Sequence, residues 1–482
     1  MKKIEAFNLK LIKMRIRVVF TILIITALVG CKAGKNYKGA ELNVPDKFYF
    51  DEEISPENIS INTKSLQKDS ISDLNFFSLF KDPILDSLIK KSLVYNQDLN
   101  IAAETVIQAQ DGLAIQRSSM LPSIGVDAGA SRGNFQGLLL PQTQNNFYAV
   151  AFASWEIDFW GKFRRLNEAA RARIVQSEEG YRATKLSLVT AVAANYFLLL
   201  DYQNRLDISE RNLALRDSVL DIIEKRFEKG IVAEIDVNQA QIKRAVAAEA
   251  VPVWKRLIAQ TEHRISQLTG ANPGRILTET SLYDIDNSIT IPVGLPSDLL
   301  ERRPDIVAAE QNLIAQNALT GSAKANLLPN ISLTGLVGGA SNELSSLTDG
   351  PLAWNAGGSL LAPLFNFGRL QRQVNIEESK TRQAILSYER TVLDAFRSVE
   401  DALVEISTLK VQLEARKQRL DASINAQFLS GERYDKGVTS YLEYLESQRQ
   451  AFESELNYSE TRRQLLIAYV NLYAALGGGW ER

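Results

Sequence analysis

The sequence carries two copies of one plan at a constant spacing of 207 residues. "RFEKGIVAEIDVNQAQ", from Arg226, and "RYDKGVTSYLEYLESQ", from Arg433, share the arginine, an aromatic residue, an acid and a Lys-Gly pair. "LPSIGV" from Leu121 matches "LPNISL" from Leu328 at the same spacing. Two further pairs keep it, Trp160 with Phe367 and Gly270 with Gly477. Chance similarity would drift in register, so the pattern indicates an internal duplication.

Each copy has the same order of expected elements, a helix followed by two strands. In the first copy the helix runs from Asn100 to about Ser119 and ends at a Leu-Pro pair. Residues 124–131 and 147–157 then alternate apolar with polar side chains, the period of two that is typical of a strand with two different faces. The second copy repeats this order with a helix at 304–325 and alternating stretches at 331–337 and 352–361.

Both copies then become helical over a long distance. The chain from Gly161 to the Lys229-Gly230 pair has about 68 residues without proline, which would span about 100 Å as one helix. Residues 231–269 would return over about 55 to 60 Å. Helices of this length are rare in globular domains, and their apolar residues recur every three or four positions. The sequence therefore predicts long antiparallel helices packed as in a coiled coil.

The four expected strands have the length of membrane-crossing strands, which need about 9 to 11 residues at a tilt. Tyr148 and Trp155 lie where aromatic residues would meet the membrane surface. Four strands cannot close a barrel, and an open sheet edge is not tolerated in lipid, so several chains would have to pool their strands. The alternative interpretation is a soluble domain with one four-stranded sheet.

The N-terminus has the features of a lipoprotein signal peptide. "MRIRVVFTILIITALVGC", from Met14 to Cys31, places arginines before an apolar run of about 12 residues, too short for a membrane-spanning helix. We expect residues 1–30 to be removed, with Met14 as an alternative start, and lipid to be attached to Cys31. Lys32 favours sorting to the outer membrane, and residues 31–75 would form a polar tether. The alternative is an uncleaved N-terminal anchor.

Enzyme chemistry finds little support in the sequence. The chain has one histidine, His263, and one cysteine, and it carries no phosphate-binding loop, zinc-protease, serine-hydrolase or dinucleotide motif. Net charge is −2 from 55 basic and 57 acidic residues, which gives no electrostatic reason to expect nucleic acid as a partner. We interpret the charged run Arg302-Arg303-Pro304-Asp305 as a helix junction. No cofactor or metal is expected besides the covalent lipid on Cys31.

Several motifs, taken in their order and spacing, resemble the TolC family of outer membrane efflux proteins, in particular the lipoprotein branch that serves resistance-nodulation-division pumps. These motifs are the lipobox at Cys31, "LLERRPDIVAAEQNLIAQNA", "LLPNISLTG", "FNFGRL" and "RYDKGVTSYLEYLESQR". The resemblance implies a mixed membrane α+β fold in which three chains build a twelve-stranded outer-membrane β-barrel continuous with a periplasmic α-helical barrel. It also implies efflux-protein repeats at 76–290 and 291–482.

The Lys-Gly pairs would form two hairpin tips at the periplasmic ends of the helices. Gly230 and Gly437 can adopt the left-handed conformation after a helix end. In the family, such tips contact a periplasmic adaptor, also called a membrane fusion protein. The resemblance therefore implies six docking residues, which are Arg226, Gly230, Ile231, Arg433, Gly437 and Val438.

The resemblance also implies a pore gate at the second tip, formed by Leu442 and Glu446. These residues lie four positions apart and so share one helix face. Three symmetry-related Glu446 carboxylates would repel one another and attract cations. The first copy has Ile235 and Gln239 at the matching positions, both uncharged. The alternative for Glu446 is a solvated charge on a helix surface.

The function expected from the sequence is a passive outer-membrane exit duct of a tripartite efflux system. Its partners would be a periplasmic adaptor, an inner-membrane pump of the resistance-nodulation-division type and outer-membrane lipid. Two alternatives stay open, the outer-membrane duct of a type I secretion system and a lipid-anchored periplasmic coiled-coil scaffold without a pore. The exported substrate is not encoded in any motif.

Overall fold

The computed structural model describes residues 32–40, 44–45, 48–49, 76–134, 143–286, 289 and 296–479. The expected signal peptide, Cys31 and most of the expected 31–75 tether lie outside these residues. The chain divides into two compact units, each with segments from both copies of the repeat. The strand unit takes in residues 1–41, 105–178 and 308–389, and the tip unit takes in 42–104, 179–307 and 390–482.

The helices of the two copies keep the 207-residue spacing at both ends. This holds for three pairs: α5 (Gln97–Ser118) with α9 (Pro304–Ala325), α6 (Lys162–Glu228) with α10 (Arg369–Asp435), and α7 (Glu234–Leu268) with α11 (Tyr441–Ala475). The long helices expected from the sequence are therefore confirmed within a few residues. The shorter helices α3 (Phe76–Phe80), α4 (Pro83–Tyr95) and α8 (Asp298–Arg302) complete the described helical part.

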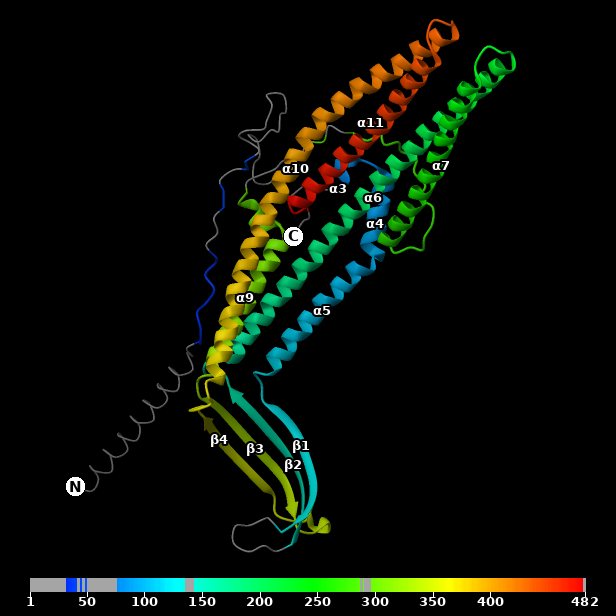
Figure 1. The fold of residues 1–482 in the computed structure, drawn as a ribbon. Helices are drawn as coiled ribbons and strands as arrows, with labels where there is room; N and C mark the ends of the chain where they lie inside the picture. Colours follow the sequence, from blue (N-terminus) through cyan, green and yellow to red (C-terminus); the bar gives the residue numbers. More distant parts are fainter. Residues whose placement is uncertain are drawn as a thin grey trace, which may run out of the picture. The chain divides into compact units, whose positions relative to one another are not determined.

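The strand unit contains one antiparallel sheet of four strands. The strands β1 (Ser123–Gly133), β2 (Gln144–Ile157), β3 (Asn330–Ser341) and β4 (Ala353–Leu361) lie side by side in chain order (Figure 1). A short 3-10 turn at Leu344–Ser346 precedes β4. The central pair joins the two copies, because β2 and β3 are paired from Ile157 opposite Ile331 to Phe147 opposite Ser341.

Small residues let two helices of the strand unit approach closely. Ala169 and Ala172 of α6 pack against Ala315 and Ala318 of α9, and all four side chains are buried. A residue with no side chain beyond Cβ leaves room for the facing backbone, so these alanines set the contact between the two copies in this unit.

The N-terminal segment lies against the same helices. The buried Arg165 of α6 donates from Nε to the carbonyl of Ala33 at 2.9 Å and from Nη2 to the carbonyl of Gly34 at 2.9 Å. Tyr37 donates its hydroxyl to Glu310 of α9 at 3.0 Å. The residues that directly follow Cys31 are therefore held to the start of α6.

The tip unit has its own apolar core. Val189, Val192 and Tyr196 of α6 are fully buried there, and the Tyr196 hydroxyl donates to Asp82 at 2.7 Å. Asp82 also accepts from the first backbone amides of α4, which it caps. Among the described helices, α6 has one stretch apolar enough to cross a membrane, with mean hydropathy 1.5, and half of that stretch is buried. We interpret this stretch as part of the core.

Candidate channel wall and helical tips

One face of the sheet is apolar across all four strands. The pairing places Ile124 of β1 opposite Ala153 of β2, and Val337 of β3 opposite Trp354 of β4. Because alternate residues of a strand share a face, the rest of this face follows from the register. It includes Val126, Ala151, Trp155, Leu333, Ala356 and Leu360. Ile124 is 81% exposed and Trp354 is 73% exposed, so this apolar surface is uncovered in the single chain.

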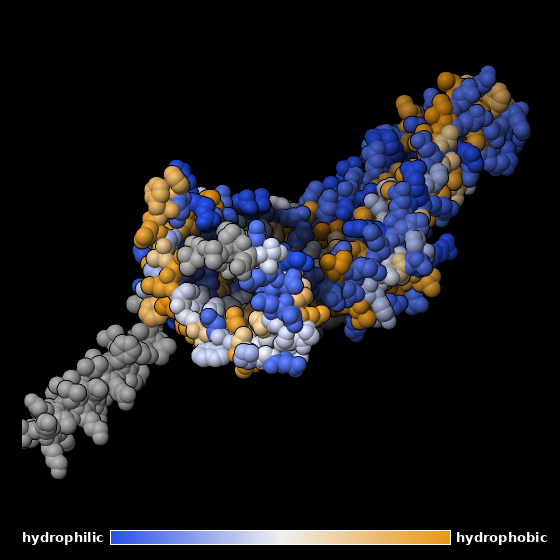
Figure 2. Space-filling view, turned by 90° about the horizontal axis from the view of Figure 1, so that it is seen from below, coloured by the Kyte–Doolittle hydropathy of each residue, from blue (hydrophilic) through white to orange (hydrophobic). Residues whose placement is uncertain are grey.

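The opposite face of the sheet is polar, with aromatic residues laid over glycines. Its polar members include Ser123, Asp127, Ser131, Ser154, Thr334, Asn355 and Ser359. A Cβ added at Gly125 would lie 2.6 Å from the ring of Phe152, and one added at Gly129 would lie 2.6 Å from the hydroxyl of Tyr148. Only glycine leaves room for these rings. Figure 2 shows hydrophobic and hydrophilic residues together on the surface of the strand-bearing part.

The outer edges of the sheet are open. Within the described chain, β1 pairs with β2 alone and β4 pairs with β3 alone. An unpaired edge presents backbone donors and acceptors that must be satisfied in lipid. A sheet with an exposed apolar face, a polar face and two free edges fits a wall shared by several chains.

The two helical tips close with the same backbone turn. At the first tip the Ile231 amide donates to the Arg226 carbonyl at 2.9 Å, and the Gly230 amide donates to the Phe227 carbonyl at 2.8 Å. At the second tip the matching bonds from Val438 to Arg433 and from Gly437 to Tyr434 measure 2.9 and 3.0 Å. This pair of bonds is the Schellman motif, and it requires a left-handed residue after the helix end. Gly230 at φ 70° and Gly437 at φ 72° supply it.

The side chains of the expected docking residues face different surroundings. The Arg226 guanidinium lies over the Tyr434 ring, 4.9 Å from its centroid, so it connects the two tips. Arg433 forms an ion pair with Glu443 at 3.2 Å. Ile231 and Val438 are both 66% exposed, and they are the apolar members of the set that a partner could cover.

The expected gate residues lie on an exposed face of α11. Leu442 is 69% exposed. Glu446 is ion-paired with Arg449 at 2.5 Å and accepts from the Gln450 side chain at 2.9 Å. Hydrogen bonds from Arg449 and then Gln450 lower the pKa of Glu446 to about 2. Arg449 also pairs with Glu453 at 2.6 Å.

The sequence interpretation missed Arg449. Glu446 is therefore better described as one half of an acid–base pair within the chain than as a bare acid. The spacing of three residues between Glu446 and Arg449 was the available signal, since residues three apart on a helix are neighbours.

The remaining candidate residues have structural surroundings. His263 is exposed on α7. Arg303 pairs with Asp305 at 2.8 Å and donates to the Ala475 carbonyl at 2.8 Å, at the C-terminal end of α11. Asp305 accepts from the Ile306 amide in the first turn of α9. This is the helix junction expected from the sequence. The described residues contain no cluster of metal ligands.

Comparison with known proteins identifies the class. The family model described as "Outer membrane efflux protein" matches residues 88–271 and 295–478. The solvent efflux pump outer membrane protein SrpC of Pseudomonas putida is 34% identical over 410 residues, covering 83% of this chain and 87% of that protein. The cation efflux system protein CusC of Escherichia coli is 31% identical over 461 residues, covering 95% of this chain and 97% of that protein.

A solved structure has the same fold. The Campylobacter jejuni CmeC outer membrane channel superposes with a TM-score of 0.84 at 25% identity, covering 94% of this chain and 96% of that one. The resemblance and the fold class expected for the chain are thereby confirmed, with the duplicated strand pair and long antiparallel helices. The chain belongs to the outer membrane efflux protein family and is an outer-membrane efflux channel protein.

Proposed function

We propose that three copies of this chain assemble into one exit duct of a tripartite efflux system. The observation that carries this proposal is the sheet, with its exposed apolar face, its polar face and its two open edges. Three chains would contribute twelve strands, and the free edges of β1 and β4 would pair between neighbours. Pairing in this way leaves no unsatisfied edge in the membrane.

The strand lengths and faces suit this arrangement. The four strands have 11, 14, 12 and 9 residues, against about 9 to 11 needed to cross the bilayer at a tilt. The apolar face would contact lipid, and the polar face with Asp127, Thr334 and Asn355 would line a water-filled lumen.

The second tip is our candidate for the gate. Leu442 would narrow the pore by its apolar side chain, and Glu446 with Arg449 would add a ring of paired charges next to it. Because each acid is neutralised by a base three residues away, the ring would oppose passage by size more than by net charge.

The tips, the lipid and the pump have separate proposed roles. Arg226, Gly230 and Ile231 of the first tip would contact a periplasmic adaptor, and so would Arg433, Gly437 and Val438 of the second. Lipid on Cys31 would anchor each chain. An inner-membrane pump, of the resistance-nodulation-division type, would supply the energy. Two relatives are named for solvent and for cation efflux, so we place the choice of substrate in the pump partner.

Planar-bilayer recording tests the duct directly. The full-length protein, purified from the outer-membrane fraction, should run as a heat-modifiable trimer and conduct ions. A soluble rod that does not conduct would instead support the scaffold alternative. Mass spectrometry of the mature N-terminus tests the lipid, because a diacylglyceryl group on Cys31 adds a defined mass. An unmodified or uncleaved N-terminus would contradict the proposed anchor.

A further inference from the structure

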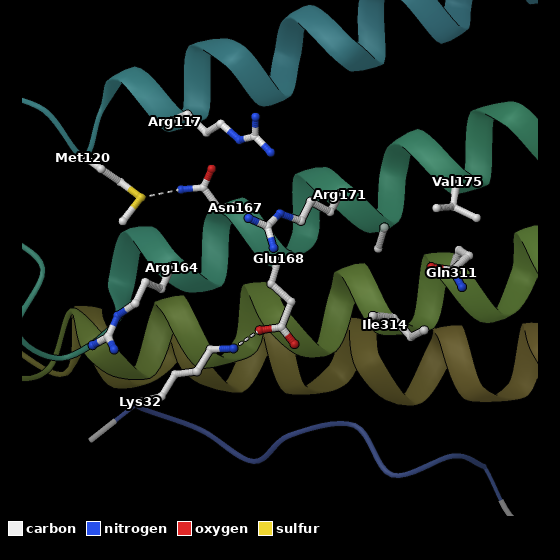
Figure 3. Close-up of a pocket in the computed structure, with 11 residues that line it drawn as sticks. Lys32, Arg117, Met120, Arg164, Asn167, Glu168, Arg171, Val175, Gln311 and Ile314 are labelled. Carbon is white, nitrogen blue, oxygen red and sulfur yellow. Dashed lines mark hydrogen bonds and ion pairs between the residues drawn. The ribbon is translucent and has the colours of Figure 1, made fainter. Parts of the chain in front are cut away.

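A cavity of about 610 Å³ lies in the strand unit, and none of the residues discussed for the gate or the tips lines it. Figure 3 shows it between the end of α5, the start of α6 and the facing side of α9, next to the N-terminal segment. Four cationic side chains line it: Lys32, Arg117, Arg164 and Arg171. Among its described lining residues, Glu168 is the one carboxylate.

Two of the four cations are not neutralised. Lys32 is ion-paired with Glu168, and Arg164 is paired with Asp158 at 3.2 Å. Within the described part of the chain, the guanidinium groups of Arg117 and Arg171 have no hydrogen-bond or ion-pair partner, and both residues are exposed. Figure 3 shows Arg117 reaching from α5 toward the side of α6 that carries Arg171. The cavity therefore has a surplus of positive charge provided by two guanidinium groups from different helices.

The cavity also has an apolar part and a defined place in the fold. Met120, Val175 and Ile314 line it together with the cations. Met120 lies three residues before the start of β1, and Arg164 follows the end of β2 by seven residues. If the strands cross the outer membrane, as proposed above, this point is where they leave it. Headgroups of the periplasmic leaflet would lie at the same depth.

We propose that this cavity binds a phospholipid by its phosphate. Guanidinium groups of Arg117 and Arg171 would donate to the phosphate oxygens, a pairing that suits the planar fork of arginine. Met120, Val175 and Ile314 would contact the glycerol end of the acyl chains. A bound phospholipid would fill the space beside Lys32, which follows the proposed lipidation site in sequence, and would fix the membrane depth of the strand unit.

Native mass spectrometry can test this site on the full-length protein in a non-ionic detergent. The probe is dihexanoyl phosphatidylglycerol, and the expected result is saturable binding of one lipid per chain. The Arg117→Gln and Arg171→Gln variants should each bind about tenfold more weakly, because each loses a charged hydrogen bond. The matched control is Arg173→Gln, which removes the same charge two residues further along α6, where the side chain lines a different cavity.

The outcomes separate the lipid from other anions and from the channel function. Inorganic phosphate should bind far more weakly than the lipid, because it lacks the acyl contacts. Equal affinity for inorganic phosphate would overturn the lipid assignment in favour of a general anion site. Equal weakening by Arg173→Gln, or no saturable binding, would overturn the site itself. Planar-bilayer conductance should be unchanged in all three variants, so a failed binding test leaves the duct proposal standing.

Discussion

The tip of the first copy and the tip of the second copy share a backbone turn and differ in their surfaces. Both turns are built from the same two amide bonds and a glycine with positive φ, Gly230 in one and Gly437 in the other. The helices that leave the turns, α7 and α11, then present different side chains at matching positions. The two copies therefore share the backbone hydrogen bonds of the turn and differ in the side chains exposed on the helix that follows it.

The first tip presents an apolar stripe, and the second tip presents charges at two of the three matching positions. On α7 the stripe is made by Ile235, Ile242 and Val246, which are 60%, 59% and 59% exposed. At the same positions α11 has Leu442, Arg449 and Glu453, and Arg449 pairs with acids on both sides. An exposed apolar stripe at spacings of seven and four residues is typical of a helix that packs on another helix. We infer that the first tip is a packing surface and the second a surface that meets water.

The largest expected effect is on the pore. Replacing Leu442 and Glu446 together with alanine should raise single-channel conductance, because it removes the apolar side chain and the charged one from the proposed constriction. The matched change in the first copy, Ile235→Ala with Gln239→Ala, should leave conductance nearly unchanged. Recordings in planar bilayers measure both. Equal conductance of the α11 double variant and the wild type would place the constriction elsewhere.

The second prediction concerns the counter-ion that only the second tip has. Arg449→Gln should raise the pKa of Glu446 from about 2 toward its ordinary value of about 4.3, because the main hydrogen-bond donor is lost. In the wild type the pair stabilises the tip above about pH 4 and loses its effect as the pH falls through 2. In the variant, cation selectivity should rise at neutral pH and titrate away between about pH 5 and 4.

Reversal potentials across a salt gradient, measured from pH 7 to pH 3, check this prediction. The control is Ile242→Gln, which places the same side chain at the matching position of α7, where no acid would be uncovered. A wild-type selectivity that already titrates near pH 4 to 5 would contradict the pairing of Glu446 with Arg449.

The sequence predicted the backbone of the tips better than their electrostatics. Gly230 and Gly437 follow helix ends directly, and a glycine at that place has one common geometry, so the turn could be read locally. Glu446 was identified, but its charge state depends on which of several neighbouring side chains reaches it. Arg449 and Gln450 both lie within reach of Glu446, and the folded helix shows that both donate to its carboxylate.

The strand unit shows the same limit at longer range. Alternation of apolar residues predicted the strands and their two faces, since that pattern depends on neighbours in sequence. The pairing of β2 with β3 joins the two copies, and it depends on contacts between residues more than 170 positions apart, such as Ile157 with Ile331. The hydrogen bonds from Arg165 to residues 33 and 34 could not be predicted from local patterns either. Their acceptors are backbone carbonyls, which every residue has, so no residue type indicates them.

The third prediction concerns the free energy that each glycine contributes to its turn, which should be similar because the two turns have the same geometry. Gly230→Ala and Gly437→Ala should each destabilise their tip by about 1 to 2 kcal/mol, the cost of a left-handed conformation for a residue with a Cβ. No atom outside the turn lies within 4 Å of a Cβ at either glycine, so sterics with neighbours add nothing. Hydrogen exchange of residues near each turn measures the local opening free energy. Unequal costs would show that one turn is supported from outside.

The smallest expected effect is on the local stability of the tips, and it differs between Arg226 and Arg433, which occupy matching positions in the two copies. Arg226→Gln removes the contact with the half-buried Tyr434 ring, worth about 0.5 to 1 kcal/mol, and so should speed hydrogen exchange in both tips. Arg433→Gln removes an ion pair whose side chains are 55% and 51% exposed, and such pairs contribute about 0 to 1 kcal/mol and are screened by salt. The effect of Arg433→Gln should therefore vanish in high salt, whereas that of Arg226→Gln should persist.

A double-mutant cycle with Tyr434→Leu isolates the ring contact. If Arg226 acts through Tyr434, Arg226→Gln should have little further effect once the ring is gone. An undiminished effect in the Tyr434→Leu background would mean that Arg226 stabilises the first tip alone. The cation would then not connect the two tips, which would be joined by their shared apolar core alone. A diminished effect would show that the Arg226–Tyr434 contact links the apolar tip to the charged one in addition to the core that the two tips share.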